Sequence, residues 1–503
     1  MKAKNKKYEW LVNKDIYTTQ SYIEENQEYF CASLSSISRK KKMDSILCDE
    51  LLQEIFRRLP PPSSAAVSLV CKKWLYLLRS STTSLSLCFI QPPFLPSFTS
   101  FLRFHPFLST VSVTVTSTVD SSDQLLLSVA SSCPKLRHLR FLNCPVSSLS
   151  LLSLSASCPN LVSLAVTLFR PLCFSWLNPF KSLKELSIYS AGNSGELDSG
   201  GLDFVGPCEL NLESLLLTGI QSSDKGVGFL WRNCKKVRTL KLKSCEGVGD
   251  QASFLAFLEC LEGLQEVELR TCRGIADGVL LKLAESSVML NSLLLYDGGS
   301  KEGLLHFLGQ SKCGGSLQNL DLRLPLDLDN NHLTAAAENL GSLRSLRLQS
   351  CCLVTGEGLK ILGNAMANGL EELALINCDV VERESGLLTT LGQDLKRLRK
   401  LDLSFNDMLL DKELISMLVS CNNLNELKVR GCKKLTNLAM VSLAKCCEKL
   451  QSVDVMYCCG MDAQGVEFFV LNSPNLRLLH VEGNKVSDVA RTWASHKSIE
   501  VVA

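Results

Sequence analysis

The sequence has little of what catalysis or metal binding requires. Only six histidines occur in 503 residues, and none stands in an HExxH pattern or another ligand spacing. They are His105, His138, His306, His332, His480 and His496. The sequence also lacks a CxxC pair, a P-loop, a GxGxxG after a strand and a GxSxG elbow. We therefore expect no catalytic residue, no metal site and no cofactor.

An excess of charge and long apolar runs are absent as well. Lys plus Arg number 53 and Asp plus Glu number 51, which leaves a net charge of +2. Such a chain has no overall field to attract nucleic acid or an anionic membrane, although it leaves room for local patches. The most apolar stretch, Leu85–Leu108, is interrupted by prolines and by Arg103. We expect neither nucleic acid nor a membrane as a partner.

Cysteine, in contrast, is abundant, with 23 residues. A small secreted chain would pair such cysteines, but this chain is long. Its first residues, Met1–Asp15, are charged throughout and lack the apolar core of a signal peptide. We interpret most cysteines as reduced thiols buried as small hydrophobic side chains. The expected location is therefore the cytoplasm, the nucleus or both.

A repeat with the pattern LxxLxL determines the predicted architecture. Its alternating aliphatic residues are typical of a short strand with one buried face. Fourteen copies begin at Leu136, Leu161, Leu183, Leu212, Val237, Leu264, Leu290, Leu317, Leu343, Leu370, Leu398, Leu424, Leu450 and Leu476. A weaker copy begins at Leu108. Regular spacing over so many copies predicts a stack of similar structural units.

The remainder of each unit predicts a turn and a helix. Three residues after the last aliphatic position stands Cys144, Cys245, Cys272, Cys351, Cys378, Cys432 or Cys458, with Asn406 and Asn484 in other units. We expect these small side chains to enter the turn. Gly274–Ser286 and Lys434–Cys446 have the apolar spacing of amphipathic helices, with Ala276-Asp277 and Thr436-Asn437 as predicted N-caps. The Gly- and Ser-rich Ala191–Gly201 is predicted to be a surface loop.

These units resemble the cysteine-containing class of leucine-rich repeats, with the pattern LxxLxLxxC followed by TDxxLxxLAxxC. The match is most specific from Leu290 onward and looser before Leu212. The resemblance implies an α/β fold, a curved solenoid of about 14–15 units with a parallel sheet on its concave side. We assign residues 107–503 to the solenoid and residues 83–106 to a linker and its N-terminal start.

Residues 43–82 have a different pattern and predict a small all-α module. Leu51, Leu52, Ile55, Phe56 and Leu59 form a helical stripe, which the following proline run ends. A second helix is predicted over Ser64–Leu78. About 40 residues bury little apolar surface alone, so the stripe is expected to face a partner. Residues 1–42 are predicted to be a flexible extension, in which Arg39–Lys42 is either solvated or a nuclear import signal.

The segment MDSILCDELLQEIFRRLPPPSSAAVSLVCKKWLYLLRSS resembles an F-box. Cys48 departs from the family, which usually has proline there. The resemblance implies that a Skp-type adaptor binds the module and links it to a cullin–RING ubiquitin ligase. The implied adaptor contacts are Leu47, Leu51, Leu52, Ile55, Phe56, Leu59, Val67, Val70 and Trp74. The chain itself is then a non-catalytic member of the ligase.

The outward-facing strand residues predict a second surface, on the concave face. Its cationic and aromatic members are Lys241, Lys243, Arg270, Tyr296, Arg323 and Arg347, from five successive units. Arg and Tyr dominate many binding sites, and clustered cations favour an acidic or phosphorylated protein segment. Glu268 and Asp321 lie among them and would neutralise part of this charge.

The sequence leaves three functions open. The first is substrate selection for an SCF-type (Skp–cullin–F-box) ubiquitin ligase, in which the concave face holds a protein substrate. The second is a scaffold without ligase activity, and the third is a ligand-gated receptor of the same family. No interval between units exceeds 29 residues, so the long loops that cover the ligand in such receptors are missing.

Overall fold

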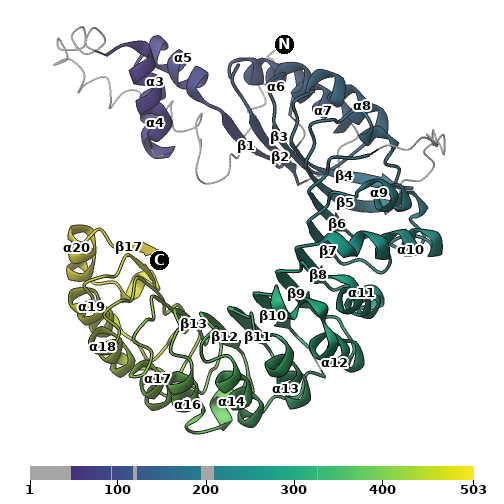
Figure 1. Ribbon diagram of the computed structural model, residues 1–503. Coiled ribbons are helices and arrows are strands. Elements are labelled where there is room, and N and C mark those ends of the chain that lie inside the picture. The colour runs from purple at the N-terminus through teal and green to yellow at the C-terminus, as the bar shows by residue number, and fades with distance from the viewer. Residues whose placement is uncertain are drawn as a thin grey trace, which may run out of the picture. The chain divides into compact units, whose positions relative to one another are not determined.

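The computed structural model describes residues 47–59, 61–91, 93–116, 122–193, 209–325 and 327–502. The chain divides into two compact units, Met1–Lys236 and Val237–Ala503. Both are built from parallel strands and connecting helices, with seventeen strands among the described residues (Figure 1). The α/β leucine-rich-repeat fold predicted from the sequence is confirmed.

Three short helices are the first elements of the first unit among its described residues. They are α3 (Asp49–Arg58), α4 (Pro61–Ser68) and α5 (Lys72–Ser81). The single helix predicted over Ser64–Leu78 is wrong, because the chain turns at residues 69–70 and starts a new helix. The Sγ of Cys71 accepts a hydrogen bond from the backbone N–H of Trp74 at 3.4 Å and so caps α5. Pro61 begins α4, at a position where the missing N–H has no helical partner to lose.

The three helices enclose a small core of their own. Leu52 and Phe56 of α3 and Leu77 and Leu78 of α5 are its buried members. Leu47, Leu59, Val67 and Trp74 pack against them and are partly buried. The rings of Phe56 and Trp74 lie 5.4 Å apart, a separation at which tilted aromatic rings attract. The Lys73 Nζ lies 2.7 Å from a carboxylate oxygen of Asp49, which adds an exposed ion pair between α5 and α3.

Strands and helices alternate through the rest of the first unit. The strands are β1 (Ser84–Phe89), β2 (Thr110–Val115), β3 (His138–Val146), β4 (Ser163–Arg170), β5 (Glu185–Asn193) and β6 (Ser214–Thr218). The helices are α6 (Leu95–Arg103), α7 (Ser122–Ser132), α8 (Ser148–Ser157) and α9 (Gly228–Asn233), with 3-10 turns at Ser175–Leu177 and Lys225–Val227. Each strand from β1 to β5 pairs in parallel with the next one along the chain.

The second unit continues the same alternation. Its strands are β7 (Thr239–Lys243), β8 (Glu266–Arg270), β9 (Ser292–Tyr296), β10 (Asn319–Arg323), β11 (Ser345–Gln349), β12 (Glu372–Ile376), β13 (Lys400–Asp402), β14 (Glu426–Lys428), β15 (Ser452–Asp454), β16 (Leu478–His480) and β17 (Glu500–Val502). Its helices are α10 (Gln251–Cys260), α11 (Arg273–Ser286), α12 (Lys301–Gln310), α13 (Asn330–Asn339), α14 (Gly356–Ala365), α15 (Asp379–Arg383), α16 (Leu387–Asp394), α17 (Asp411–Leu418), α18 (Asn437–Cys446), α19 (Ala463–Asn472) and α20 (Asp488–His496). Short 3-10 turns lie at Leu261–Gly263, Lys312–Gly315 and Gly483–Lys485.

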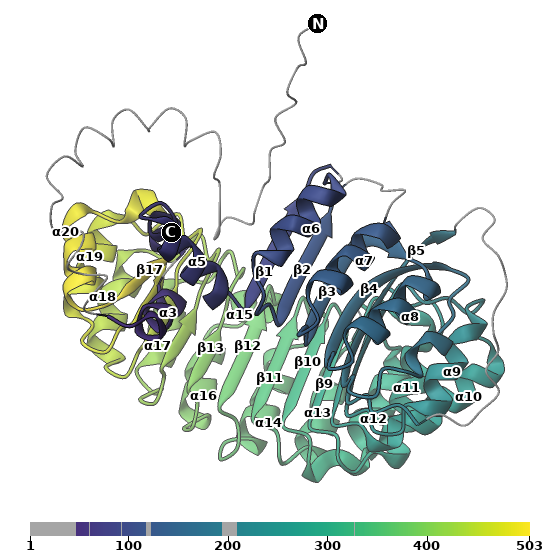
Figure 2. The same cartoon turned by 90° about the horizontal axis from the view of Figure 1, so that it is seen from above.

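Within this second unit the strands line the concave side of an arc, and the helices cover its convex side (Figures 1 and 2). The pairing register aligns the same repeat positions on successive strands, as in the row Leu320, Leu346 and Leu373. Leu346 and Leu373 are only 1% and 3% exposed. The predicted register of the repeats is therefore confirmed, because a slip of one residue would turn these side chains to solvent.

The repeats begin before the weak copy at Leu108. Residues assigned to a linker and solenoid start contain β1 and α6, and β1 pairs with β2 from Ser84 to Phe89. Leu85, Leu87 and Phe89 are buried, and the residues between them are more exposed. The proline-rich stretch that follows obscured this alternation in the sequence. The repeat that contains β1 also lacks the first leucine of the LxxLxL pattern, since Thr82 stands at that position.

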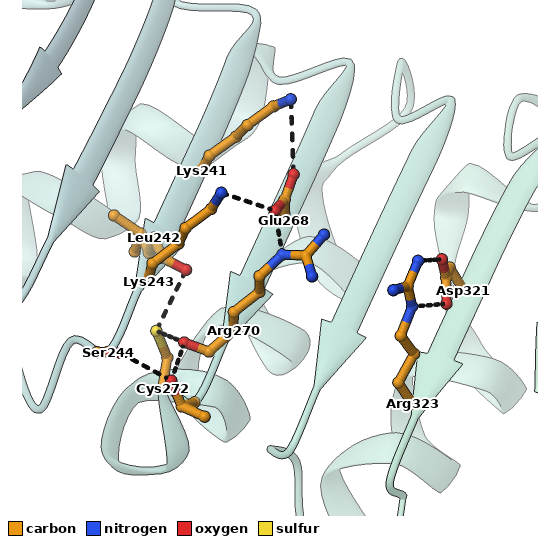
Figure 3. A network of polar contacts seen from close by, with 10 residues as sticks. Lys241, Leu242, Lys243, Ser244, Glu268, Arg270, Cys272, Asp321 and Arg323 are labelled. Carbon is orange, nitrogen blue, oxygen red and sulfur yellow. Dashed lines mark hydrogen bonds and ion pairs between the residues drawn. The ribbon is translucent and has the colours of Figure 1, made fainter. Parts of the chain in front are cut away.

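The cysteines after the strands form what we call the thiol column. Cys245, Cys272, Cys378, Cys432 and Cys458 are buried there, and most donate their S–H to a carbonyl of the preceding unit. Examples are the bond from Cys272 Sγ to the carbonyl oxygen of Leu242 at 3.4 Å and that from Cys458 Sγ to Val429 at 3.0 Å. Figure 3 shows the first of these.

Asn406 occupies the same column with a stronger set of bonds. Its side-chain amide donates to the carbonyl oxygens of Leu375 and Leu403, each at 2.8 Å, and its Oδ1 accepts from the N–H of Cys378 at 2.9 Å. Asn484 does not share this place: it is exposed in the 3-10 turn Gly483–Lys485. In this unit the 3-10 turn connects β16 to α20.

The predicted helix caps gave one success and one error. The Thr436 hydroxyl accepts from the N–H of Leu438 and caps α18, as predicted. The cap predicted at Ala276-Asp277 is wrong, because α11 begins earlier, at Arg273. The Asp277 carboxylate instead accepts from the N–H of Ser300 at 2.7 Å, in the next unit.

The loop predicted over Ala191–Gly201 starts as the end of β5, and its remainder lies outside the described residues, as do residues 1–46.

Candidate functional site

The N-terminal module exposes several apolar side chains that its own core does not use. Leu51 and Ile55 project from α3 with 52% and 44% of their surface exposed. Leu69 and Val70, in the turn after α4, and Tyr76 of α5 are exposed as well. We call these five side chains the docking face. Exposed apolar groups of this size on a small module are typical of a partner surface.

The structure divides the nine predicted adaptor contacts into two sets. Leu51, Ile55 and Val70 belong to the docking face. Leu52 and Phe56, each 4% exposed, lie in the core of the module, and Leu47, Leu59, Val67 and Trp74 pack around that core. The prediction of a direct surface contact is therefore corrected for Leu52 and Phe56, because the helical stripe turns its other edge outward. Leu69 and Tyr76, which were not among the nine predicted contacts, are also exposed and stand outside that stripe.

The six predicted concave residues occupy one face of five successive strands, β7 to β11. Lys243, Arg270, Tyr296 and Arg323 align in one row of paired residues. Lys241 and Arg347 stand in the neighbouring row, which also holds Glu268 and Asp321. The structure thus places all six side chains on the concave face, as the repeat register required.

Glu268 is the centre of the charged group on β7 and β8. Its carboxylate bonds the Nε of Arg270 and lies 3.5 Å from Lys241 Nζ and 3.6 Å from Lys243 Nζ (Figure 3). Burial alone would raise the pKa of Glu268, but the hydrogen bond from Arg270 and the three positive charges hold the pKa below its usual value. Glu268 is therefore ionised at neutral pH and shared by three cations.

The other two cations have carboxylate partners of their own. Arg323 makes two hydrogen bonds to Asp321, at 2.6 and 2.9 Å. Arg347 Nη2 lies 3.5 Å from Asp402, two strands away. The sequence argument that clustered cations repel one another is therefore corrected, because every cation of the patch has a carboxylate within 3.6 Å. What remains is an excess of positive charge on β7 and β8.

Arg347 and Asp402 reach toward each other over the small side chain of Ala374. The three residues align on β11, β12 and β13, and Ala374 is only 8% exposed although it faces the concave side. A hollow of about 230 Å³ lies here and extends from Ser292 on β9 to Lys428 on β14. The buried Nε of Arg347 has no hydrogen-bond partner within the described part of the chain.

Further cations lie toward the C-terminal units. Lys428 bonds Glu426 at 2.8 Å, and the Arg430 guanidinium stacks over the ring of Tyr457 at 4.8 Å. Lys428 and Arg430 are thus engaged by neighbouring side chains, and they form no group of cations around one carboxylate.

The described ranges contain no helix of a length and hydropathy suited to crossing a bilayer. In the same ranges, no three metal-binding side chains of the His, Cys, Asp or Glu type come together.

The fold and its N-terminal helices define a leucine-rich-repeat protein with a separate docking module. Comparison with protein families is consistent with both parts. Residues 45–83 match the F-box domain, and residues 342–363 match a Leucine Rich repeat. The chain therefore combines an F-box segment with leucine-rich repeats.

Curated and solved proteins with detectable similarity are distant. A Caenorhabditis elegans protein described as "Putative RNA-binding protein EEED8.10" is 25% identical over 296 residues. The match covers 57% of this chain but only 38% of that relative. Similar solved structures include the yeast complex of Rad7 and Elc1 (TM-score 0.39, 16% identity, 96% of each chain). Another is the protein LIC12759 of Leptospira interrogans (TM-score 0.33, 15% identity, 86% of this chain and 92% of that one).

Proposed function

We propose that this protein is the substrate-recognition subunit of an SCF-type ubiquitin ligase. The F-box module binds the Skp-type adaptor through the docking face, and the adaptor joins it to a cullin–RING ligase. The concave face of the repeats binds the protein substrate, with Lys241, Lys243, Arg270, Tyr296, Arg323 and Arg347 as its contacts. Ubiquitin is transferred by the other subunits, so this chain contributes position and selection but no chemical step.

The observation that carries the proposal is the docking face itself. A module with four fully buried apolar side chains leaves Leu51, Ile55, Leu69, Val70 and Tyr76 in solvent. Burying one such side chain in an interface contributes about 1.5–3 kcal/mol. A module that keeps them exposed is organised for a partner. The proposal includes a cytoplasmic or nuclear location, which is supported by the many reduced, buried thiols of the repeats.

The first prediction tests the docking face. We expect Leu51→Ala combined with Ile55→Ala to weaken binding of a purified Skp-type adaptor by about 2 kcal/mol or more, as for residues at the centre of an interface. Isothermal titration calorimetry with the full chain measures this change. Leu149→Ala on α8 is the matched control, since Leu149 is 76% exposed and lies in the repeats. Equal affinity of the double variant and the control would refute the docking face.

A second measurement separates the ligase from a scaffold without ligase activity. The tagged chain is recovered from cells with the proteasome inhibited. A ligase subunit brings down both the adaptor and a cullin, and its bound partners carry ubiquitin chains. A scaffold brings down the adaptor without the cullin, or partners without ubiquitin, and either result would remove the proposed function.

A further inference from the structure

The positive charge of this protein is distributed unevenly along the chain. From the start of α5 to the residue before β5, residues 72–184 contain ten Lys or Arg and two Asp, which gives a net charge of +8. Because the whole chain carries +2, the remaining residues carry −6. The overall charge that predicted no membrane partner therefore conceals a strongly cationic region in the first repeats. Such a region attracts anionic surfaces even when the molecule as a whole is nearly neutral.

Part of this charge gathers where the chain enters β2 and β3, at the C-terminal ends of α6 and α7 (Figure 1). Arg103 ends α6, and Lys135 and Arg137 lie between α7 and β3. Thr110 of β2 pairs with His138 of β3, which brings the two connections side by side. The three cations are exposed, and among the described residues of this unit the ion pairs involve other side chains.

Two phenylalanines project from the same place. Phe104 and Phe107 lie in the loop between α6 and β2, and 52% and 46% of their surface is exposed. The loop is fixed by its own backbone, since the N–H of His105 donates to the carbonyl of Leu102 at 2.9 Å and the N–H of Leu108 to that of His105 at 3.3 Å. We call Arg103, Phe104, Phe107, Lys135 and Arg137 the basic edge. A fixed loop that keeps two large apolar rings in solvent among cations is organised for a partner.

Both rings are already stacked against cations. The Arg79 guanidinium lies 4.6 Å from the centre of the Phe104 ring, and the Lys135 ammonium lies 4.4 Å from that of Phe107. A nucleobase stacks on an open ring face and would compete with these cations. The surface of a lipid bilayer makes no such demand, because it accepts an apolar ring in any orientation while neighbouring Lys and Arg reach the headgroups.

Negative charge is remote from the basic edge in the repeats that form it. Asp123 lies at the N-terminal end of α7, an 11-residue helix whose other end leads to Lys135. A helix of that length separates the two residues by about 16 Å, which exceeds the Debye length of about 8 Å at physiological salt. The Asp123 carboxylate also accepts from the N–H of Ser147 at 2.8 Å. Asp120 lies outside the described residues. The described part of these two repeats therefore offers an anionic surface little repulsion.

We propose that the basic edge binds the surface of a bilayer that contains anionic phospholipid. Phe104 and Phe107 enter the apolar boundary beneath the headgroups, and Arg103, Lys135 and Arg137 bind the phosphates and carboxylates of the headgroups. Apolar contact and electrostatic attraction act together, as reversible binding to a membrane requires. This inference goes beyond the proposed function, because it holds the chain at a cytoplasmic membrane surface and uses no residue of the docking face.

The test measures sedimentation of the purified full chain with vesicles of phosphatidylcholine, with or without about one quarter of phosphatidylserine. We expect binding at least tenfold tighter with phosphatidylserine, because each Lys or Arg at an anionic surface strengthens binding about fivefold. Lys135→Glu combined with Arg137→Glu should lose at least tenfold of that affinity, and added salt should weaken binding of the unchanged chain by screening. Phe104→Ala combined with Phe107→Ala should lose at least about fivefold, because the apolar contact is gone.

Each variant of the basic edge has a matched control in the second unit. Lys434→Glu combined with Lys445→Glu reverses two exposed lysines and gives the same net charge as the edge variant. Leu410→Ala combined with Leu438→Ala removes two side chains that are 54% and 57% exposed. Both controls should bind the vesicles like the unchanged chain, and circular dichroism should show that every variant is folded. Equal losses in an edge variant and its control would overturn the proposal, as would equal binding to the two kinds of vesicle.

Soluble anions separate a bilayer from other partners. Inorganic phosphate should weaken vesicle binding no more than sodium chloride of the same ionic strength, and stronger displacement would assign the basic edge to free phosphate instead. A single-stranded RNA oligonucleotide or polyglutamate that binds the basic edge more tightly than the vesicles would also overturn the proposal. The assay needs no adaptor or cullin. A chain that binds vesicles but recruits no cullin refutes only the proposed ligase function, and one that recruits the cullin but ignores the vesicles refutes only this inference.

Discussion

At the scale of single residues, adjacent cysteines differ sharply in their burial. Cys351 and Cys458 are buried in the thiol column, and Cys352 and Cys459, each the next residue, are exposed. Burial raises the pKa of Cys458 to about 12, and a hydrogen bond with Cys378 together with burial raises that of Cys351. Since the thiolate is the nucleophile, the buried member of each pair is inert near neutral pH.

Brief alkylation tests this difference within each pair. We expect a short treatment of the folded chain with iodoacetamide at pH 8 to modify Cys352 and Cys459 at least tenfold faster than Cys351 and Cys458. Peptide mass spectrometry reads both members of a pair from one digest, and the denatured chain, in which all four react, is the control. Faster reaction at Cys458 than at Cys459 would show that the strand register is shifted by one residue.

The same scale shows the limit of sequence reasoning about charge. The repeat register assigned all six concave residues to one face, because strand alternation depends only on position. It left open which carboxylate each cation would meet. Glu268 and Asp321 were noted as neutralising, but Asp402 pairs with Arg347 across two strands. Such a contact depends on the small side chain at Ala374 and on side-chain conformations, and neither follows from the repeat pattern.

At the scale of elements, the F-box module separates core contacts from surface contacts. The helical stripe in the sequence shows which residues of α3 are apolar. It does not show which of them pack in the core of the module and which stay on its surface. The break at residues 69–71 divides the predicted second helix into α4 and α5. That break has a weak sequence signal, since a cysteine replaces the usual serine or threonine cap. The expected adaptor follows from the family resemblance, and the structure shows which apolar residues of α3 are exposed.

Two aromatic residues of α5 allow a test of this separation. Trp74 packs on Phe56, so Trp74→Ala should destabilise the module by about 2 kcal/mol, below the range for fully buried tryptophans because the side chain is only partly buried. Tyr76 is 69% exposed, and Tyr76→Ala should change stability by less than about 0.5 kcal/mol. Hydrogen exchange of the α3 and α5 amides measures both effects.

Adaptor titration completes the comparison. Tyr76→Ala should weaken adaptor binding although the module stays folded, and Trp74→Phe should restore the protection that Trp74→Ala loses. Faster exchange in Tyr76→Ala than in Trp74→Ala would mean that the core and the docking face have been interchanged.

At the scale of the whole molecule, the repeat period predicted the strands from Leu108 onward and the parallel sheet. The same pattern recurs in every repeat of the sequence. The structure of a repeat with a weak pattern can therefore be predicted from the repeats beside it. The ends are harder, because end units lack a neighbour on one side and depart from the pattern. β1 shows this, because it lies in the segment predicted as linker and N-terminal start of the solenoid, and Thr82 stands where the pattern has its first leucine. The insert after β5 has no counterpart in other units and lies partly outside the described residues.

Stability of the repeat stack depends on bonds between units, and Asn406 offers the clearest test. Asn406→Ala removes the side-chain partners of the Cys378 N–H and the Leu375 carbonyl in a buried place, and leaves the Leu403 carbonyl with the Cys432 thiol as a donor, so we expect a loss of about 3 kcal/mol. Hydrogen exchange should increase in β12 and β13 first, as in a chain of coupled units. Asn475→Ala is the control, because that exposed asparagine donates one bond, to Glu448. Equal effects of the two variants would contradict the role of the column.

The thiol column also constrains how such a protein can change its length during evolution. Most members of the column (Cys272, Cys378, Asn406, Cys432 and Cys458) donate to a carbonyl of the preceding unit, so these units are joined by a donor on one side and an acceptor on the other. Duplication of a complete unit inserts a matched donor and acceptor, and the column continues through it. Insertion of part of a unit separates a buried donor from its carbonyl on both sides. Growth and loss by whole repeats are therefore the changes that the interior of this stack tolerates.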